Sequence, residues 1–361
     1  METILADIHQ TFFCADTVAE VEAFVSLHSE AFVSLNFSAT EGVPLDRFRQ
    51  AYINLKTEVG VSSDLLRRLL GLLHNIERLQ LFLPKDATSD VFINIDFPNL
   101  VKFSTNAPHA VIENFLSAHP QIRWLSLDRP VIPNSLQPIA PFMTMDRLLC
   151  PVALLRDVHF PLSRLQALYL DINSGQATIS EDLQKMASHC GQKAIFAELT
   201  HLCIQIAPSD VSVMREISRL FPALRNLTLM EICLVNARQS VDGPRAWDAF
   251  NDEWYHILLT LPSLQTFTLA TVSLLLEPHP LGDRLAEEFL VHHWAGGAMQ
   301  VPHPALRCIV AAYPSWAGSP PEIASFWKSE DGSLGGWKRV NVVRGGEMVN
   351  RSIMAGYWEM P

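Results

Sequence analysis

The sequence predicts an α/β protein in which one short unit, a helix followed by a proline turn and a short strand, recurs along the chain. Three observations support this prediction: an apolar frame that repeats, a proline at a fixed place before the frame, and a helix-like segment before the proline. At 361 residues the chain is long, since a single hydrophobic core stops growing at roughly 250–300 residues. The chain must therefore divide into domains or repeat a small unit along one axis.

The frame has the form apolar-x-x-apolar-x-apolar, and positions are counted from its first apolar residue, the lead. Side chains of a strand alternate between two faces, so +3 and +5 (inward positions) share one face and +2, +4 and +6 (outward positions) the other. Strong copies are Ile76/Leu79/Leu81, Ile122/Leu125/Leu127, Leu165/Leu168/Leu170, Leu199/Leu202/Ile204, Leu224/Leu227/Leu229, Leu264/Phe267/Leu269 and Trp337/Val340/Val342. Weaker copies are Phe32/Leu35/Phe37, Leu100/Phe103/Thr105 and Leu306/Ile309/Ala311.

A proline stands two residues before the lead in several units, at Pro98, Pro120, Pro222, Pro262 and Pro304. Proline disfavours the helical conformation in the residue before it, so a helix ends there and the chain turns into the strand. Helices are expected ahead of these turns at residues 62–73, 109–118, 181–190, 210–220, 247–260 and 283–294. In residues 210–220 the apolar side chains of Val213, Met214, Ile217 and Leu220 form one helical stripe.

The spacing of the leads is uneven. It is short from Leu199 to Leu224 but long from Ile122 to Leu165, from Leu224 to Leu264 and from Leu264 to Leu306. Each long step either hides a degraded unit, for which residues 142–155 are a candidate, or carries an insertion.

Composition excludes several classes of protein. Hydrophobic residues make up 48% and charged residues 18%, which argues against general disorder. The formal net charge of −11, with no run of Lys and Arg, argues against nucleic-acid binding. Residues 257–276 are uncharged over about the length of a membrane span, but they contain Pro262 and fit the frame, so we expect them in the core.

Cysteine usage and the first residues favour a cytoplasmic or nuclear protein. The cysteines lie far apart with no C-x-x-C pair, which favours reduced, buried thiols; they are Cys14, Cys150, Cys190, Cys203, Cys233 and Cys308. The first residues also lack the basic stretch of a signal peptide.

The common catalytic motifs are missing from the sequence: it has no G-x-S-x-G elbow, Walker loop or H-E-x-x-H. His292 and His293 are adjacent, and on a helix adjacent side chains point about 100° apart, so the pair cannot hold one metal ion together. We therefore expect neither an enzyme nor a metal, cofactor or small-molecule substrate.

The candidate functional site is the outward strand face, where aromatic and isolated charged side chains gather. Trp, Tyr and Arg tend to dominate the energetics of protein interfaces. We expect Trp124 and Tyr169 to be at least partly exposed there; the alternative is that they pack under a loop or the C-terminal tail. Asp128 and Asp171, at matching +6 positions, favour a partner with basic residues. The predicted partner-binding residues are Arg78, Phe82, Trp124, Asp128, Tyr169, Asp171, His201 and Gln205.

The units resemble leucine-rich repeats over residues 65–343. Phe97-Pro98-Asn99-Leu100 and Phe221-Pro222-Ala223-Leu224 look like the divergent repeats of F-box-type leucine-rich proteins, which are numerous in mushroom-forming fungi. The resemblance implies an irregular horseshoe solenoid, with a parallel sheet on the concave face and helices on the convex face. Two features depart from the family: the asparagine that follows the strand at +8 is matched only by Asn173, and residues 1–60 contain no recognisable F-box.

Three regions are expected: a mostly helical N-terminal cap at 1–60, the solenoid at 61–311, and a C-terminal cap and tail at 312–361. In the tail, residues 323–328 read as a short helix and residues 337–343 as a strand. The expected function is protein recognition without catalysis, and the resemblance implies a ubiquitin-ligase substrate receptor with cullin-ligase subunits as partners. The alternatives are a structural or degenerate repeat protein with no dedicated partner and, ranked lowest, an enzyme with an unrecognised site.

Overall fold

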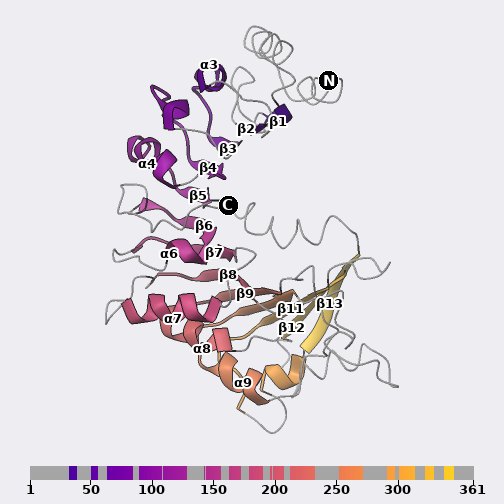
Figure 1. Cartoon of the computed structure of the whole chain (residues 1–361). Coiled ribbons are helices and arrows are strands. Elements are labelled where there is room, and N and C mark those ends of the chain that lie inside the picture. The colour runs from indigo at the N-terminus through magenta and orange to yellow at the C-terminus, as the bar shows by residue number, and fades with distance from the viewer. Residues whose placement is uncertain are drawn as a thin grey trace, which may run out of the picture. The chain divides into compact units, whose positions relative to one another are not determined.

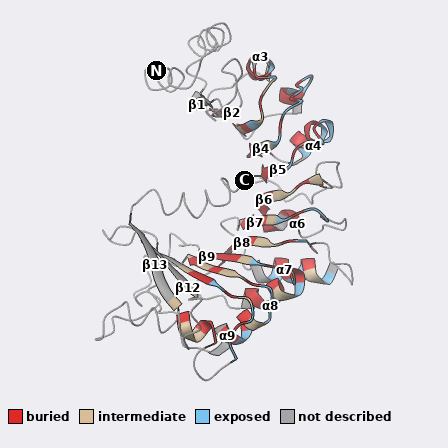
Figure 2. Cartoon of the chain, turned by 180° about the vertical axis from the view of Figure 1, so that it is seen from behind, coloured by how far each residue is buried: buried red, intermediate tan, exposed pale blue. Residues whose placement is uncertain are grey.

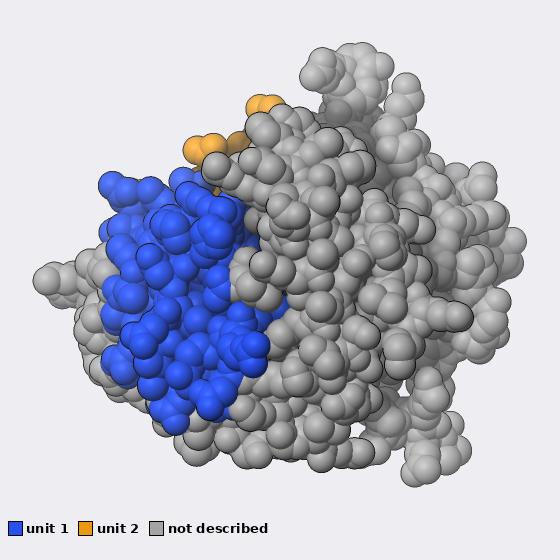
Figure 3. All heavy atoms as spheres, turned by 90° about the horizontal axis from the view of Figure 1, so that it is seen from above, with its two compact units in different colours: residues 1–166 blue, residues 167–361 orange. Residues whose placement is uncertain are grey.

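The computed structural model describes residues 32–38, 50–55, 63–83, 89–107, 109–127, 142, 144–155, 162–171, 179–189, 196, 198–206, 212–231, 252–270, 291–296, 301–313, 322–328 and 337–344. The chain divides into two compact units, which are coloured separately in Figure 3. Unit 1 comprises residues 1–166 and unit 2 comprises residues 167–361. The division falls inside residues 61–311, which were expected to form one solenoid.

The strands described in unit 1 are neighbours in space in the order in which they occur in the sequence (Figure 1). Strand β1 pairs antiparallel with β2, and β2 to β6 are parallel. Parallel neighbours need a crossover connection, and helical segments supply it where the connections are described. The elements are β1 (Phe32–Ser38), β2 (Gln50–Leu55), α3 (Ser63–Leu72), β3 (Arg78–Phe82), η2 (Ser89–Phe92), β4 (Lys102–Thr105), α4 (His109–Ala118), β5 (Trp124–Leu127), β6 (Arg147–Pro151) and α6 (Val152–Leu155).

Unit 2 repeats this arrangement and then departs from it. Strands β7 to β11 are parallel, whereas β12 and β13 continue the sheet as an antiparallel pair beside β11. Helices α7 and α8 pack against each other (Figure 1). The elements are β7 (Ala167–Asp171), α7 (Ile179–His189), β8 (His201–Ile206), α8 (Ser212–Leu220), β9 (Asn226–Glu231), α9 (Asp252–Leu259), β10 (Thr266–Ala270), β11 (Cys308–Tyr313), β12 (Glu322–Lys328) and β13 (Trp337–Arg344).

These elements confirm the α/β class and, within each unit, the parallel pairing of successive repeat strands. The frame also predicts burial correctly at its inward positions. In β3, Leu79 and Leu81 are buried while Arg78 is exposed. In β9, Leu227 and Leu229 are both buried as expected. The period-two alternation therefore sets the direction of the inward side chains in both units.

The helices predicted ahead of the proline turns are confirmed wherever the structure describes them. Helix α4 has the expected bounds, and α3, α7, α8 and α9 coincide with the expected segments to within a few residues. On α8 the whole predicted stripe is buried, from Val213 to Leu220, and Figure 2 shows helices that carry both buried and exposed residues. Of the helix expected at 283–294, only residues 291–294 are described, and they are helical.

A repeated backbone pattern links neighbouring strands where each strand begins. The carbonyl oxygen at +1 of one unit accepts two N–H groups from the next: Glu77 O accepts from Val101 and Lys102, both at 2.9 Å. In unit 2, Arg225 O accepts from Gln265 and Thr266 in the same way, at 2.7 and 3.0 Å. This backbone ladder joins successive units without the asparagine at +8; Asn173 itself lies outside the described residues.

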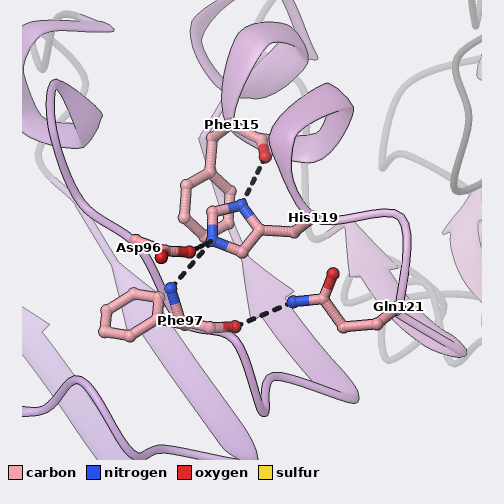
Figure 4. A network of polar contacts seen from close by, with 5 residues as sticks. All are labelled: Asp96, Phe97, Phe115, His119 and Gln121. Carbon is pink, nitrogen blue, oxygen red and sulfur yellow. Dashed lines mark hydrogen bonds and ion pairs between the residues drawn. The ribbon is translucent and has the colours of Figure 1, made fainter.

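A buried histidine supports one of the proline turns (Figure 4). The Nε2 atom of His119 accepts a hydrogen bond from the Phe97 N–H at 3.0 Å, and Nδ1 lies 2.6 Å from the carbonyl oxygen of Phe115. Because Nε2 accepts, the ring proton lies on Nδ1 and is donated to Phe115. The Gln121 amide donates to the Phe97 carbonyl at 2.8 Å. His119 thus ties the end of α4 to the turn of the preceding unit.

The structure resolves the uneven spacing of the leads. Residues 142–155 do hide a degraded unit, because they contain β6, which pairs in parallel with β5. The other two long steps are insertions: β9 pairs directly with β10, and β10 directly with β11. The sequence frame also missed one repeat strand, β2, in which Ala51 and Ile53 take the buried inward positions.

At the ends of the repeat the expectations have different outcomes. The helix expected at residues 323–328 is wrong, because these residues form strand β12. A short apolar run has no strong conformational preference of its own, and here pairing with β11 makes it a strand. Strand β13 is a strand as expected, but its match to the frame is accidental, since it pairs antiparallel with β12. Residues 1–60 were expected to be mostly helical, and the described part of them consists of strands β1 and β2. Strand β1 coincides with the weaker copy of the frame that begins at Phe32. The helical expectation for the rest of this region lies outside the described residues.

The structure also describes three of the cysteines and part of the uncharged stretch at residues 257–276. Cys150, Cys203 and Cys308 are free and buried as expected, whereas Cys14, Cys190 and Cys233 lie outside the described residues. In the part of the chain that is described, no helix is long and apolar enough to cross a bilayer. The described part of residues 257–276 contributes to α9 and β10.

Candidate functional site: the outward strand face

Six of the eight predicted partner-binding residues have described side chains, and all six lie on strands at outward positions. Asp128 lies outside the described residues, and Asp171 ends β7 with a side chain that is not described. The expectation of a basic partner rested on these two aspartates and stays a prediction. The six are Arg78, Phe82, Trp124, Tyr169, His201 and Gln205.

The parallel register aligns the +2 positions of unit 1 in a single row across the strands. Arg78 pairs with Lys102, Lys102 with Trp124, and Trp124 with Arg147. Neighbouring strands are about 4.8 Å apart, so consecutive members of the row are in contact range. We call Arg78, Lys102 and Arg147, together with the Trp124 ring among them, the basic row.

The expectation that Trp124 is partly exposed is wrong, since only 6% of its surface is accessible. Alternation does turn the ring outward, but side chains of the neighbouring strands lie against it. The Lys102 ammonium lies 4.1 Å from the ring centroid, and the Arg147 guanidinium 5.5 Å from it. Both distances lie within the range of a cation–π interaction. Trp124 is therefore a buried ring with two partly exposed cations beside it.

Tyr169 is also buried, with 5% of its surface accessible, which contradicts the expected exposure. Its hydroxyl accepts a hydrogen bond from the Gln205 side chain at 2.9 Å. Two predicted partner-binding residues on neighbouring strands, β7 and β8, thus contact each other. A buried tyrosine hydroxyl usually has such a partner, so this pair contributes to the packing of unit 2.

His201 also makes its contacts within unit 2. The Asn226 amide, on the next strand, lies 2.8 Å from His201 Nε2, and Thr200 Oγ1 lies 2.8 Å from Nδ1. An amide nitrogen can only donate, so Nε2 accepts and the ring proton faces the Thr200 hydroxyl.

Phe82, the last predicted residue of unit 1, is half-buried beside Tyr52, with ring centroids 5.7 Å apart.

Lys102 and Arg147 belong to the row but were not among the predicted residues. Both occupy +2 positions of units that the frame matched poorly: Leu100/Phe103/Thr105 has a polar +5, and Met145/Leu148/Cys150 has a cysteine there. Thr105 and Cys150 are nonetheless fully buried, so small or weakly polar side chains serve at +5. The first of these units was counted only as a weaker copy of the frame and the second only as a suspected unit. Applying the +2 rule to both would have found the two cations.

The electrostatics of the row are unusual for an acidic protein. Burial, together with the positive charges of Arg78 and Arg147, lowers the pKa of Lys102 to about 8. Among the described residues, neither Arg78 nor Lys102 has a carboxylate within ion-pair distance. The next row of outward positions is uncharged, with Tyr52, Gln80, Ser104, Ser126 and Leu149 in register. Positive charge therefore collects here without a described counter-charge at Arg78 or Lys102.

The thiols on the strands are poorly suited to nucleophilic chemistry. Burial raises the pKa of Cys203 well above its usual value and that of Cys308 to about 11, so both remain protonated at neutral pH. Among the described residues, no group of three His, Cys, Asp or Glu side chains is placed to hold a metal ion.

Comparison with known proteins adds no family assignment. No protein-family model matches the chain, and no curated protein shows significant sequence similarity to it. The likeness to leucine-rich repeats therefore rests on the residues of the frame.

Proposed function

We propose that this chain is a non-enzymatic protein-recognition module of the cytoplasm or nucleus, built as an irregular leucine-rich-repeat-like solenoid. One observation carries the proposal: parallel strands present their outward side chains in register, so that residues distant in sequence form one continuous row. Strands held by buried inward leucines position these side chains with little freedom, which lowers the entropy cost of binding. A row of Arg, Lys and Trp has the composition of a protein-binding surface.

The resemblance of the repeats supports a more specific role, that of substrate receptor of an F-box-type ubiquitin ligase. In that role the outward face would hold the substrate, and cullin-ligase subunits would accompany the chain. Affinity purification of the full chain tests this role directly. A stable complex that contains a partner but no cullin-ligase subunit would contradict it while leaving protein recognition intact.

Site-specific photo-crosslinking tests the recognition role. A photoreactive amino acid replaces Arg78 or Gln80 on the outward face of β3, and Asn114, exposed on α4, serves as the control. We expect a defined partner to crosslink in cells from the strand positions and not from the helix position. If the strand positions yield no partner, or the same products as Asn114, the chain fits the alternative of a repeat protein with no dedicated partner.

A further inference from the structure

We propose that the basic row of unit 1 binds an acidic segment of a partner protein, whose Asp or Glu side chains meet Arg78, Lys102 and Arg147. This inference rests on the proposed function and names the chemistry of the partner. It differs from the sequence-based expectation, which took Asp128 and Asp171 to favour a basic partner.

The charges of the basic row lie close enough together for one short segment to reach them. Three cations lie at one level on strands β3, β4 and β6, with Trp124 on β5 between the last two. Four strands at a spacing of about 4.8 Å span about 14 Å, which an extended chain covers with about four or five residues. A short acidic segment that runs across the strands can therefore reach all three cations.

The electrostatic energy of Lys102 also favours an acidic partner. Lys102 is crowded by burial and by two like charges, which is why its pKa falls to about 8. A carboxylate placed beside it would favour the charged form and relieve the repulsion from Arg78 and Arg147. Because Arg78 and Lys102 have no described carboxylate in reach, an acidic partner gains this interaction without displacing a salt bridge at these two cations.

The charge of the whole chain favours a short acidic segment over a long polyanion. The chain has a net charge of −11, so a long polyanion such as RNA is repelled by the protein as a whole. Nucleic-acid binding draws its affinity from many phosphate contacts, whereas this row offers three cations. A segment with a few carboxylates suits the row better, and the indole of Trp124 beneath the cations excludes water from one side of the contact.

Binding of a labelled peptide to the full chain tests the proposal. The probe is a short peptide of alternating glutamate and glycine, compared with its glutamine counterpart and with a single-stranded RNA of similar length. We expect the glutamate peptide to bind, and the glutamine peptide and the RNA to bind at least about tenfold more weakly, a difference of about 1.4 kcal/mol. No binding of the glutamate peptide, or equal binding of the RNA, would overturn the proposal.

A matched pair of variants locates the site. The double variant Arg78→Gln/Lys102→Gln removes two charges from the row, and Arg225→Gln/Arg307→Gln removes two exposed arginines from unit 2. We expect the first to weaken peptide binding at least about tenfold and the second to change it less than about twofold. Thermal unfolding of both verifies folding, which the row variant should retain because it removes mutually repelling charges. Equal effects of the two variants would refute the assignment to the row.

The pH dependence gives a readout that a purely structural lysine would not affect. The charged groups that act on Lys102 are Arg78 and Arg147. As pH rises from about 7 to about 9, free Lys102 loses its proton, so peptide affinity should fall by up to about tenfold. Lys102→Arg keeps its charge and should bind equally at both pH values. A fall of the same size in the Lys102→Arg variant would count against Lys102 as a contact.

These outcomes separate the present inference from the proposed function. If crosslinking from β3 captures a partner but the double variant retains it and the peptide does not bind, recognition stands and the acidic segment is refuted.

Discussion

The +2 positions carry three cations in unit 1 and, apart from one histidine, uncharged side chains in unit 2. In unit 1 the in-register row is Gln50, Arg78, Lys102, Trp124 and Arg147. In unit 2 the row is uncharged apart from histidine and consists of Ala167, His201, Asn226, Thr266 and Cys308. The backbone that presents these rows is alike in both units, with parallel strands joined by a ladder of carbonyls at +1.

This difference shows that the repeat does not constrain which side chains stand at the outward positions. In unit 2 neighbours within the outward face bond to each other, as Asn226 does with His201 and Gln205 with Tyr169. In unit 1 the neighbours are cations that repel each other, and burial and this repulsion lower the pKa of Lys102. Outward side chains of unit 2 therefore bond to each other, whereas Arg78 and Lys102 in unit 1 have no described carboxylate within ion-pair distance.

The largest expected effect tests whether the two units share one core design. Leu79→Ala in β3 and Leu227→Ala in β9 remove equivalent buried inward side chains, so each should lower the free energy of unfolding by about 2–5 kcal/mol. Denaturant unfolding measures the loss, and Gln80→Ala, at an outward position, is the control. A loss well under about 1 kcal/mol at either leucine would show that the units do not share the inward face.

Two glycines should respond to alanine with opposite signs. Gly296, in unit 2, has a φ of 108°, and an added Cβ would lie 2.6 Å from the Val301 carbonyl oxygen. Gly71, in helix α3 of unit 1, has open space around its Cβ position. Gly296→Ala should cost at least about 2 kcal/mol, whereas Gly71→Ala should stabilise by about 0.5–1 kcal/mol. Thermal melts would contradict the backbone geometry if both substitutions had the same sign.

In the buried turn of unit 1, the Phe97 N–H has one hydrogen-bond partner, His119, whereas the Phe97 carbonyl oxygen has two, Gln121 and Leu100. His119→Leu leaves the buried Phe97 N–H without an acceptor, which should cost about 1–3 kcal/mol. Gln121→Ala removes a donor to the Phe97 carbonyl, but that oxygen still accepts from the Leu100 N–H at 3.0 Å, so the loss should stay below about 1 kcal/mol. If urea unfolding shows equal losses, the histidine is a packing residue only.

The smallest expected changes in stability come from substitutions at the +2 positions of the two units. Asn226→Ala breaks the hydrogen bond to His201 in unit 2 and should cost about 0.5–1.5 kcal/mol. Lys102→Gln in unit 1 relieves repulsion while losing a cation–π contact, so stability at neutral pH should change by less than about 0.5 kcal/mol. A large destabilisation by Lys102→Gln would mean that the basic row is needed for folding rather than available for a partner.

Much of the repeat could be predicted from local patterns, because burial and period follow from the chain alone. The inward leucines of β3 and β9 and the bounds of α4 agree with the structure. The strand β6 was only suspected, and β2 was missed, because cysteine or alanine stands where the frame looks for a large apolar residue. Strand β12 was mistaken for a helix because its pairing with β11 is a tertiary interaction that a short apolar run does not specify.

The sequence by itself determined the class of fold, the alternation of each repeat strand and the outward direction of Trp124 and Tyr169. Only the tertiary structure decided what those side chains meet. Direction is a local property of the backbone, but exposure depends on neighbours brought alongside by strand pairing. Lys102 and Arg147 are distant from Trp124 in different directions along the chain, yet register places both against its ring. The candidate site changed accordingly, from exposed aromatics with acidic neighbours to a row of cations over a buried indole.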